Sequence, residues 1–196
     1  MTAPTCRSVG AVPSTLGQAS TDSTRDRLLE ATRVALAQYG PRKVSLSDIA
    51  TLAGLSRPTL YRHFTSKEEL LGALGEDEKR RFAVGLAEAL QGLRGSRRLD
   101  RALRYVVETQ RAHPFRGLIA TEPAYMLRQL EQSLHSMGAS LIPLFEEAAP
   151  KRGPKGPRPA DLADLVMRTA LSHFLMPGDD DDQMLRELRH VARLET

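Results

Sequence analysis

Residues 44–71 read VSLSDIATLAGLSRPTLYRHFTSKEELL, and this stretch decides the fold of the chain. Ser45 is followed three residues later by the acid Asp48, a pattern typical of a helix N-terminus with a capping box. Gly54 follows the short helix that this pattern predicts and is expected to end it. The apolar face of the helix comprises Leu46, Ile49, Ala50 and Ala53.

A second short helix is predicted directly after Gly54. Ser56 suits its N-cap, and Pro58 suits its first turn, where the missing backbone N–H costs nothing. Leu60 and Phe64 are four residues apart and are expected to face inward. Two short helices joined by a glycine turn form a helix-turn-helix, whose second helix fits the major groove of DNA.

The polar residues of this motif are the candidate DNA contacts. Arg57 can donate two hydrogen bonds to a guanine edge, and Thr59 offers a hydroxyl or a methyl group. Tyr61, His63 and Lys67 are long enough to reach phosphate groups. Ser45 and Ser47, at the start of the first helix, could present backbone N–H and hydroxyl groups to phosphate. The full set is Ser45, Ser47, Arg57, Thr59, Tyr61, Arg62, His63 and Lys67. The pattern alone also allows a plain helical hairpin with solvated polar residues.

The charge of the chain permits DNA binding without requiring it. The formal net charge is +4. Five basic residues and one acid lie between Arg42 and Lys67, a local excess suited to a phosphate-facing surface. A solvated face on a basic protein is the alternative.

Upstream of the motif, one helix is predicted. Residues 1–20 are rich in Thr, Ser, Ala, Gly and Pro, and they are interpreted as a disordered arm. The helix is expected to begin near Thr21 or Asp22 and to stop at Gly40 and Pro41. Its inward face comprises Leu28, Ala31, Ala35, Leu36 and Tyr39.

Downstream of the motif, the pattern is helical throughout. Helices are predicted over residues 67–91, 97–113, 115–121, 123–149, 160–176 and 183–194, with a break near Pro143 and a proline-rich loop over 150–159. No segment reads as a strand. The chain is therefore expected to be all-α, with about nine helices.

Other classes of function find little support. No run of 18 apolar residues is available to span a membrane, and residues 1–20 lack the apolar stretch of a signal peptide. The single cysteine, Cys6, fits a cytoplasmic protein. His113, Glu122 and His135 match no compact metal-ligand spacing, and no catalytic motif is present. We expect no metal, no cofactor and no enzymatic activity.

Residues 22–75 closely resemble the DNA-binding domain of the tetracycline-repressor (TetR/AcrR) family. The resemblance rests on Asp48-Ile-Ala, Ala53-Gly54, Ser56, Leu60-Tyr61-Arg62-His63-Phe64, Ser66-Lys67 and Leu70. It implies a DNA-binding domain over residues 21–70 and a ligand-binding and dimerisation domain over 71–196. It also implies a homodimer that binds a palindromic operator, usually as a repressor, and leaves it when a small molecule binds. Position 58 departs mildly from the family: it is proline, so no direct contact is expected there.

The resemblance also assigns roles to the C-terminal half. The last two helices, 160–176 and 183–194, are expected to form the dimer interface. The candidate pocket residues are Tyr105, Thr109, Phe115, Tyr125, Met126, Gln129, Ser133 and Met137. Their mostly apolar character favours a hydrophobic ligand, such as a lipid-like acid, an acyl thioester or a drug; ordinary core is the alternative for each residue. Gly72 and Gly75 form either a hinge between head and body or a close helix contact.

Overall fold

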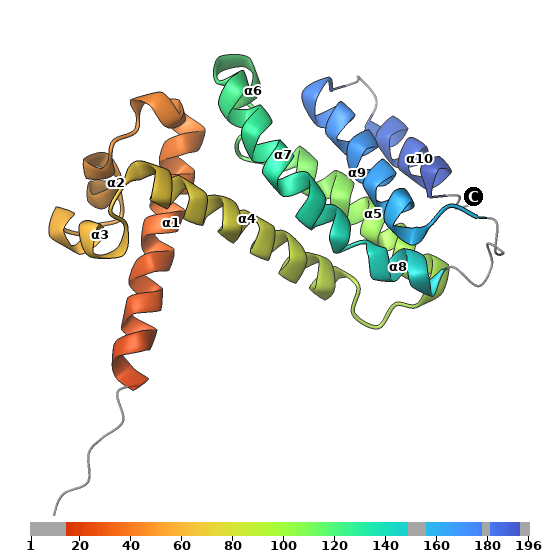
Figure 1. Ribbon diagram of the computed structural model, residues 1–196, viewed down its shortest axis with the longest axis horizontal. Coiled ribbons are helices and arrows are strands. Elements are labelled where there is room, and N and C mark those ends of the chain that lie inside the picture. The colour runs from red at the N-terminus through yellow and green to blue at the C-terminus, as the bar shows by residue number, and fades with distance from the viewer. Residues whose placement is uncertain (1–14, 149–155, 178–180, 193–196) are drawn as a thin grey trace, which may run out of the picture.

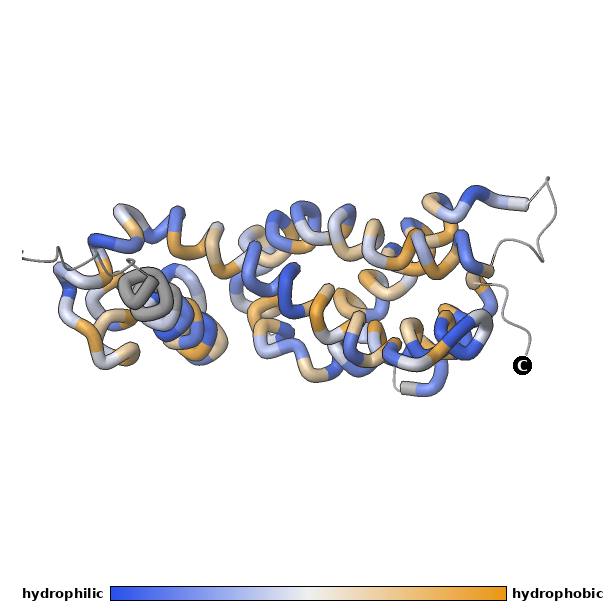
Figure 2. Tube along the Cα trace, turned by 90° about the horizontal axis from the view of Figure 1, so that it is seen from below, coloured by the Kyte–Doolittle hydropathy of each residue, from blue (hydrophilic) through white to orange (hydrophobic). Residues whose placement is uncertain are grey.

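The computed structural model describes residues 15–148, 156–177 and 181–192, and all regular structure within them is helical (Figure 1). The all-α expectation of about nine helices is thereby confirmed. Helices α1 to α3 form a head, α4 leads away from it, and α5 to α10 form an elongated body. Apolar and polar residues alternate along these helices, as expected where each buries one face (Figure 2).

The head consists of α1 (Thr15–Lys43), α2 (Leu46–Leu52) and α3 (Arg57–His63). Leu28, Leu36 and Leu60 are fully buried between these helices. The regular part of α1 ends where expected, because Gly40 has a φ of 75° and a ψ of 164°, which no helix accommodates.

Two details of α1 differ from the expectation. The helix begins at Thr15, so residues 15–20 are helical rather than part of a disordered arm; residues 1–14 lie outside the described part of the chain. Tyr39 was expected on the inward face but is 60% exposed. The buried face of α1 runs from Leu28 to Leu36, and the ring of Tyr39 lies one turn beyond it.

The long helix α4 (Lys67–Ala89) links head and body. Ser66 caps it by accepting a hydrogen bond from the Glu69 backbone N–H at 3.1 Å. The Glu69 carboxylate accepts from the backbone N–H of Thr65 at 2.7 Å, one residue before the cap. These contacts fix the start of α4 against the end of the head.

The body contains α5 (Gly95–Arg111), α6 (Leu118–Thr121), α7 (Pro123–Ala139), α8 (Ile142–Glu147), α9 (Pro159–Leu175) and α10 (Asp181–Val191). The predicted break near Pro143 is confirmed, because α7 ends at Ala139 and Pro143 lies in the first turn of α8. The last helix was expected to run to Leu194, which lies outside the described residues. No helix in the described ranges is long and apolar enough to span a membrane.

Buried apolar side chains form two cores. The body core is built from α4, α5 and α7 to α10, with Leu103, Phe145 and Val166 at its centre. The head core contains the buried residues of α1 to α3 and extends into the body through Phe115 and Phe174, among others. The head is therefore packed against one end of the body through shared apolar side chains.

Candidate functional site

The helix-turn-helix forms as the sequence predicts. The hydroxyl of Ser45 accepts a hydrogen bond from the Asp48 backbone N–H at 3.2 Å. In turn, the Asp48 carboxylate accepts a hydrogen bond from the Ser45 backbone N–H at 3.1 Å. Gly54 then takes a φ of 64°, in the left-handed region that favours glycine. The hydroxyl of Ser56 caps α3 by accepting from the Thr59 backbone N–H at 3.2 Å.

The orientation of α3 is set by its two apolar anchors. Leu60 and Phe64 are 0% and 1% exposed, so one face of the helix is fixed against the head core. Arg57, Tyr61 and Arg62 are exposed, with Tyr61 half exposed at 51%. An exposed basic and aromatic helix face of this kind fits the major groove of DNA.

The remaining DNA-contact candidates are more constrained. Thr59 and His63 are half-buried, and the Thr59 hydroxyl lies 2.8 Å from the hydroxyl of Ser56. Ser47 lies half-buried in the first turn of α2. The Lys67 amine donates to the backbone carbonyl of Val44, which leaves two of its three N–H groups for a phosphate.

Ser45 is also engaged in hydrogen bonds within the head. Its hydroxyl donates to the Asp48 carboxylate at 2.6 Å, and its backbone N–H donates to the same carboxylate. These hydrogen bonds lower the pKa of Asp48 below its usual value, the side-chain contact contributing most. Ser45 therefore acts first as a structural cap.

Two arginines that the sequence did not single out hold the motif in place. The Arg27 guanidinium donates to the Ala53 carbonyl at 2.8 Å, at the C-terminal end of α2. The Arg25 guanidinium lies over the Phe64 ring, 5.4 Å from its centroid. Both residues belong to α1, and the only available signal was the basic character of its N-terminal part.

A cavity lies between the linking helix α4 and the body. Its walls come from α4, from α5 and the turn after it, and from α7 and α9. Its empty space, with the solvent at its mouth included, is about 780 Å³. Six of the eight predicted pocket residues line it: Phe115, Tyr125, Met126, Gln129, Ser133 and Met137.

The other two predicted pocket residues lie elsewhere. Tyr105 packs against α4, where its hydroxyl donates to the Phe82 carbonyl at 3.3 Å. The Thr109 hydroxyl donates back to its own helix, to the Tyr105 carbonyl at 2.6 Å. Neither residue is among those that line this cavity.

The lining also contains residues that the sequence analysis missed. These are Leu74, Gly75, Glu78, Gln110, His113, Leu130, Leu134, Met167, Leu171 and Phe174. Burial lowers the pKa of His113, although the nearby Glu78 carboxylate acts in the opposite direction. The Nδ1 atom of His113 accepts a hydrogen bond from the Phe115 backbone N–H at 3.2 Å. The imidazole is therefore neutral, with its hydrogen on Nε2.

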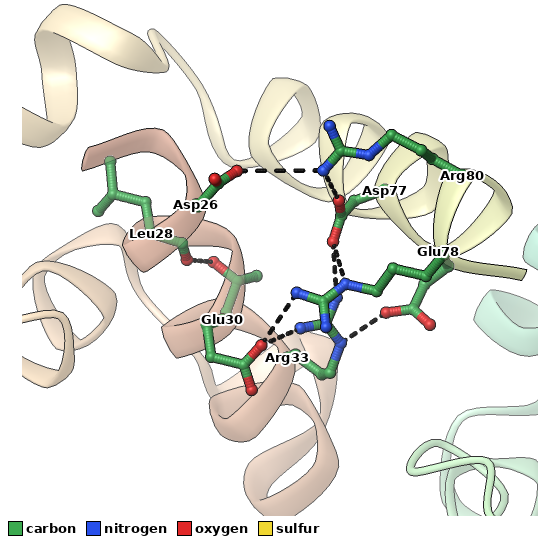
Figure 3. A network of polar contacts seen from close by, with 9 residues as sticks. Asp26, Leu28, Glu30, Arg33, Asp77, Glu78 and Arg80 are labelled. Atoms are coloured by element: carbon green, nitrogen blue, oxygen red, sulfur yellow. Dashed lines mark hydrogen bonds and ion pairs between the residues drawn. The ribbon is translucent and has the colours of Figure 1, made fainter. Parts of the chain in front are cut away.

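One lining residue also belongs to a cluster of ion pairs between α1 and α4 (Figure 3). The Arg33 guanidinium of α1 donates to Glu78 at 2.6 Å and to Asp77 at 2.8 Å, and it contacts Glu30. Burial alone would raise the pKa of Asp77, but hydrogen bonds from Arg81, Arg33 and Arg80 together hold it below its usual value. The head is thus tied to α4 beside the cavity.

The two helices predicted to form a dimer interface pack against each other at one side of the body (Figure 1). His173 of α9 and Glu187 of α10 are joined at 2.8 Å. Two large apolar side chains are exposed here: Leu165 of α9 is 48% exposed, and Met176, the residue directly after α9, is 73% exposed.

Comparison with known proteins assigns the head to a family. Residues 28–74 match the model of bacterial regulatory proteins of the tetR family. A Mycobacterium tuberculosis HTH-type transcriptional regulator is 40% identical over 62 residues, 32% of this chain and 31% of that protein. The chain thus matches about a third of the length of the first such relatives.

Two further similarities extend over most of the chain. The transcriptional repressor AcnR of Corynebacterium diphtheriae is 24% identical over 178 residues, 84% of this chain and 87% of that protein. The structure of the fatty acid degradation regulator FadR from Bacillus halodurans superimposes with a TM-score of 0.68 at 16% identity, over 86% of this chain and 94% of that one. The family and these relatives are transcription regulators rather than enzymes. The helix-turn-helix head, residues 28–74, thus matches the tetR family of bacterial regulatory proteins.

Proposed function

We propose that the chain is a cytoplasmic, sequence-specific DNA-binding repressor whose helix α3 reads the major groove. The observation that carries the proposal is the fixed orientation of α3. Leu60 and Phe64 hold one face in the head core, and the opposite face presents Arg57, Tyr61 and Arg62 to solvent. We assign DNA binding to residues 21–70, and ligand binding and dimerisation to residues 71–196.

We further propose that the chain acts as a homodimer on a palindromic operator. The exposed Leu165 of α9 and Met176 just after it offer apolar surface that a second copy would bury, together with the adjoining face of α10. Two identical heads then read two half-sites whose centres lie about 34–36 Å apart, one turn of DNA.

Selection from a pool of random DNA duplexes tests the proposal. We expect enrichment of an inverted repeat, with binding that weakens steeply as salt is raised. Arg57→Ala is expected to cost about 1–3 kcal/mol and to relax the base preference at one position of each half-site. Lys67→Ala should weaken all sequences alike. Arg97→Ala, an exposed arginine of α5, is the matched control. Recovery of no preferred sequence would refute the proposal.

We also propose that a small molecule in the cavity releases the operator. Two features support this coupling. The cavity is lined by Leu74 of α4 and Phe174 of α9, which belong to the same core as the DNA-binding helices. Glu78 lines the same cavity and forms an ion pair with Arg33 in the head. A molecule that fills the cavity therefore acts on residues that position α1.

A further inference from the structure

The only charge among the described residues of the cavity lining is negative, and its Arg33 partner lies outside the lining. Glu78 is its one charged side chain, and no lysine or arginine is among the described residues that line it. His113 is neutral, as its burial and its contact with Phe115 indicate. A carboxylate or phosphate group entering this cavity would lose its water without gaining a cationic partner. The lining therefore disfavours an acidic ligand.

One buried hydrogen-bond acceptor in the described part of the lining lacks a donor. The amide oxygen of Gln110 is buried and has no hydrogen-bond partner among the described residues. Buried polar atoms in proteins are nearly always paired, so an unpaired acceptor beside a cavity indicates that a bound molecule supplies the donor. The Glu78 carboxylate, on α4, is a second acceptor in the same wall; one of its oxygens accepts from Arg33 at 2.6 Å, which leaves acceptor sites for a bound molecule.

Aromatic rings complete the lining. The His113 ring meets Phe115 and Phe174 edge to face, with centroids 5.4 and 5.2 Å apart. Tyr125 also lines the cavity and is half-buried. Aromatic faces attract cations through their quadrupole, and they do so more strongly where water is excluded.

We infer that the effector is a lipophilic cation: an apolar body of chain or ring carbons that carries a protonated or quaternary nitrogen. The apolar body lies among the Met, Leu and Phe side chains of the cavity, and the nitrogen binds at the Glu78 carboxylate. This inference rests on the proposed effector-controlled repressor and specifies the chemistry of its ligand. It departs from the lipid-like acid and acyl thioester that apolarity alone allows.

The same charge explains how such a ligand acts on the head. The Glu78 carboxylate already pairs with Arg33 of α1 at 2.6 Å. A ligand cation at this carboxylate competes with Arg33 for its negative charge. The ligand cation and the Arg33 guanidinium also repel each other, so the ion pair between Glu78 and Arg33 weakens. A neutral molecule of the same shape lacks this effect.

Three probes that differ only in the polar group test the inference. Decylammonium, decanol and decanoate have the same chain, and each is titrated below its micelle concentration by calorimetry against the full-length protein. We expect decylammonium to bind at least tenfold more tightly than decanol, and decanoate to bind most weakly. The net charge of +4 would favour decanoate if general electrostatics controlled binding, so the opposite order must arise from the site.

Variants locate the effect. Glu78→Gln should bring decylammonium affinity down to that of decanol while leaving decanol affinity unchanged, and the retained decanol binding shows that the cavity is intact. Glu76→Gln is the matched control, because Glu76 lies on the same helix, is 74% exposed and pairs with Lys79. It should leave all three affinities unchanged.

The outcomes separate this inference from the proposed function. If decanoate or decanol binds as tightly as decylammonium, or if none of the three binds, the cation assignment is wrong. If decanoate or decanol also displaces the protein from its selected operator, the repressor proposal stands while the ligand class changes. If no operator can be selected, the repressor proposal fails, and the binding order still decides the chemistry of the cavity.

Discussion

Replacing Asp77 by asparagine tests whether the ion-pair cluster between α1 and α4 stabilises the head on the body. Asp77 is 4% exposed, and its carboxylate accepts hydrogen bonds from Arg33 and Arg81 at 2.8 Å, with Arg80 in contact as well. Asparagine keeps the shape and one acceptor oxygen but removes the charge.

The expected loss follows from the exposure of each partner. Removing one member of a fully buried ion pair costs about 3–5 kcal/mol, which is the upper bound. Arg80 and Arg81 are 62% and 52% exposed, so water replaces much of what they lose. Arg33 is 11% exposed, and in the variant it keeps its ion pairs with Glu78 and Glu30. We therefore expect Asp77→Asn to lower the free energy of unfolding by about 2 kcal/mol at pH 7.

The pH dependence carries a second signature. The folded-state pKa of Asp77 is lowered, so its contribution is fully present above the unfolded pKa of about 3.9 and is lost as pH falls through the folded pKa. Asparagine does not titrate. The difference in free energy of unfolding between wild type and Asp77→Asn should thus be constant from pH 7 to pH 5 and should shrink below about pH 4.

Urea unfolding followed by circular dichroism measures both effects. Wild type and variant are compared at one protein concentration, because association of the folded state adds to the apparent stability. Glu76→Gln, a solvent-exposed change on the same helix, should leave stability within about 0.5 kcal/mol of wild type. A deficit for Asp77→Asn no larger than that control, or one that persists undiminished at pH 3, would refute the reasoning.

Three further substitutions give sharp expectations. Gly85→Ala places a Cβ 2.3 Å from the Tyr105 hydroxyl oxygen, so we expect a loss of about 1–3 kcal/mol in urea unfolding, largely restored by adding Tyr105→Phe. Gly72→Ala meets nothing within 4 Å, so it should stabilise α4 by about 0.5–1 kcal/mol and leave operator release unchanged; a weakened ligand response would support the hinge hypothesis instead. Leu60→Ala empties a fully buried site and should cost about 2–5 kcal/mol, abolishing operator binding in a gel-shift assay; near-native binding would contradict the role of Leu60 as the anchor of α3.

The head was predictable because its signals are local. The Ser45–Asp48 and Ser56–Thr59 caps span three residues each, and Leu60 and Phe64 are one helical turn apart. Such contacts depend on helix periodicity, which the sequence displays directly. The same logic placed the break before α8 at Pro143.

The cavity was only partly predictable because its walls are assembled from distant segments. Periodicity identifies which face of a helix is buried but not which neighbour covers it. Tyr105 and Thr109 lie on α5, as expected, yet Tyr105 packs on Gly85 of α4 instead of lining the cavity. Glu78 was missed because its partner, Arg33, is 45 residues away in the sequence. No local pattern marks that pair.

In the proposed effector-controlled repressor, a small change in the cavity would reach the DNA through α4. Glu78 lies eleven residues from Lys67, the first residue of α4, and the helix is continuous between them. At a rise of about 1.5 Å per residue, the stretch of α4 between Glu78 and Lys67 is about 16 Å long. A tilt of about 5° at Glu78 therefore moves the head end of α4 by about 1.4 Å. In a symmetric dimer both heads move, so the separation of the two α3 helices changes by up to twice that amount. Rigid side chains that must meet base edges at hydrogen-bonding distance do not tolerate such a change in both half-sites together. In the proposed repressor, a change at the ion pair between Arg33 and Glu78 would therefore be transmitted along α4 to both heads.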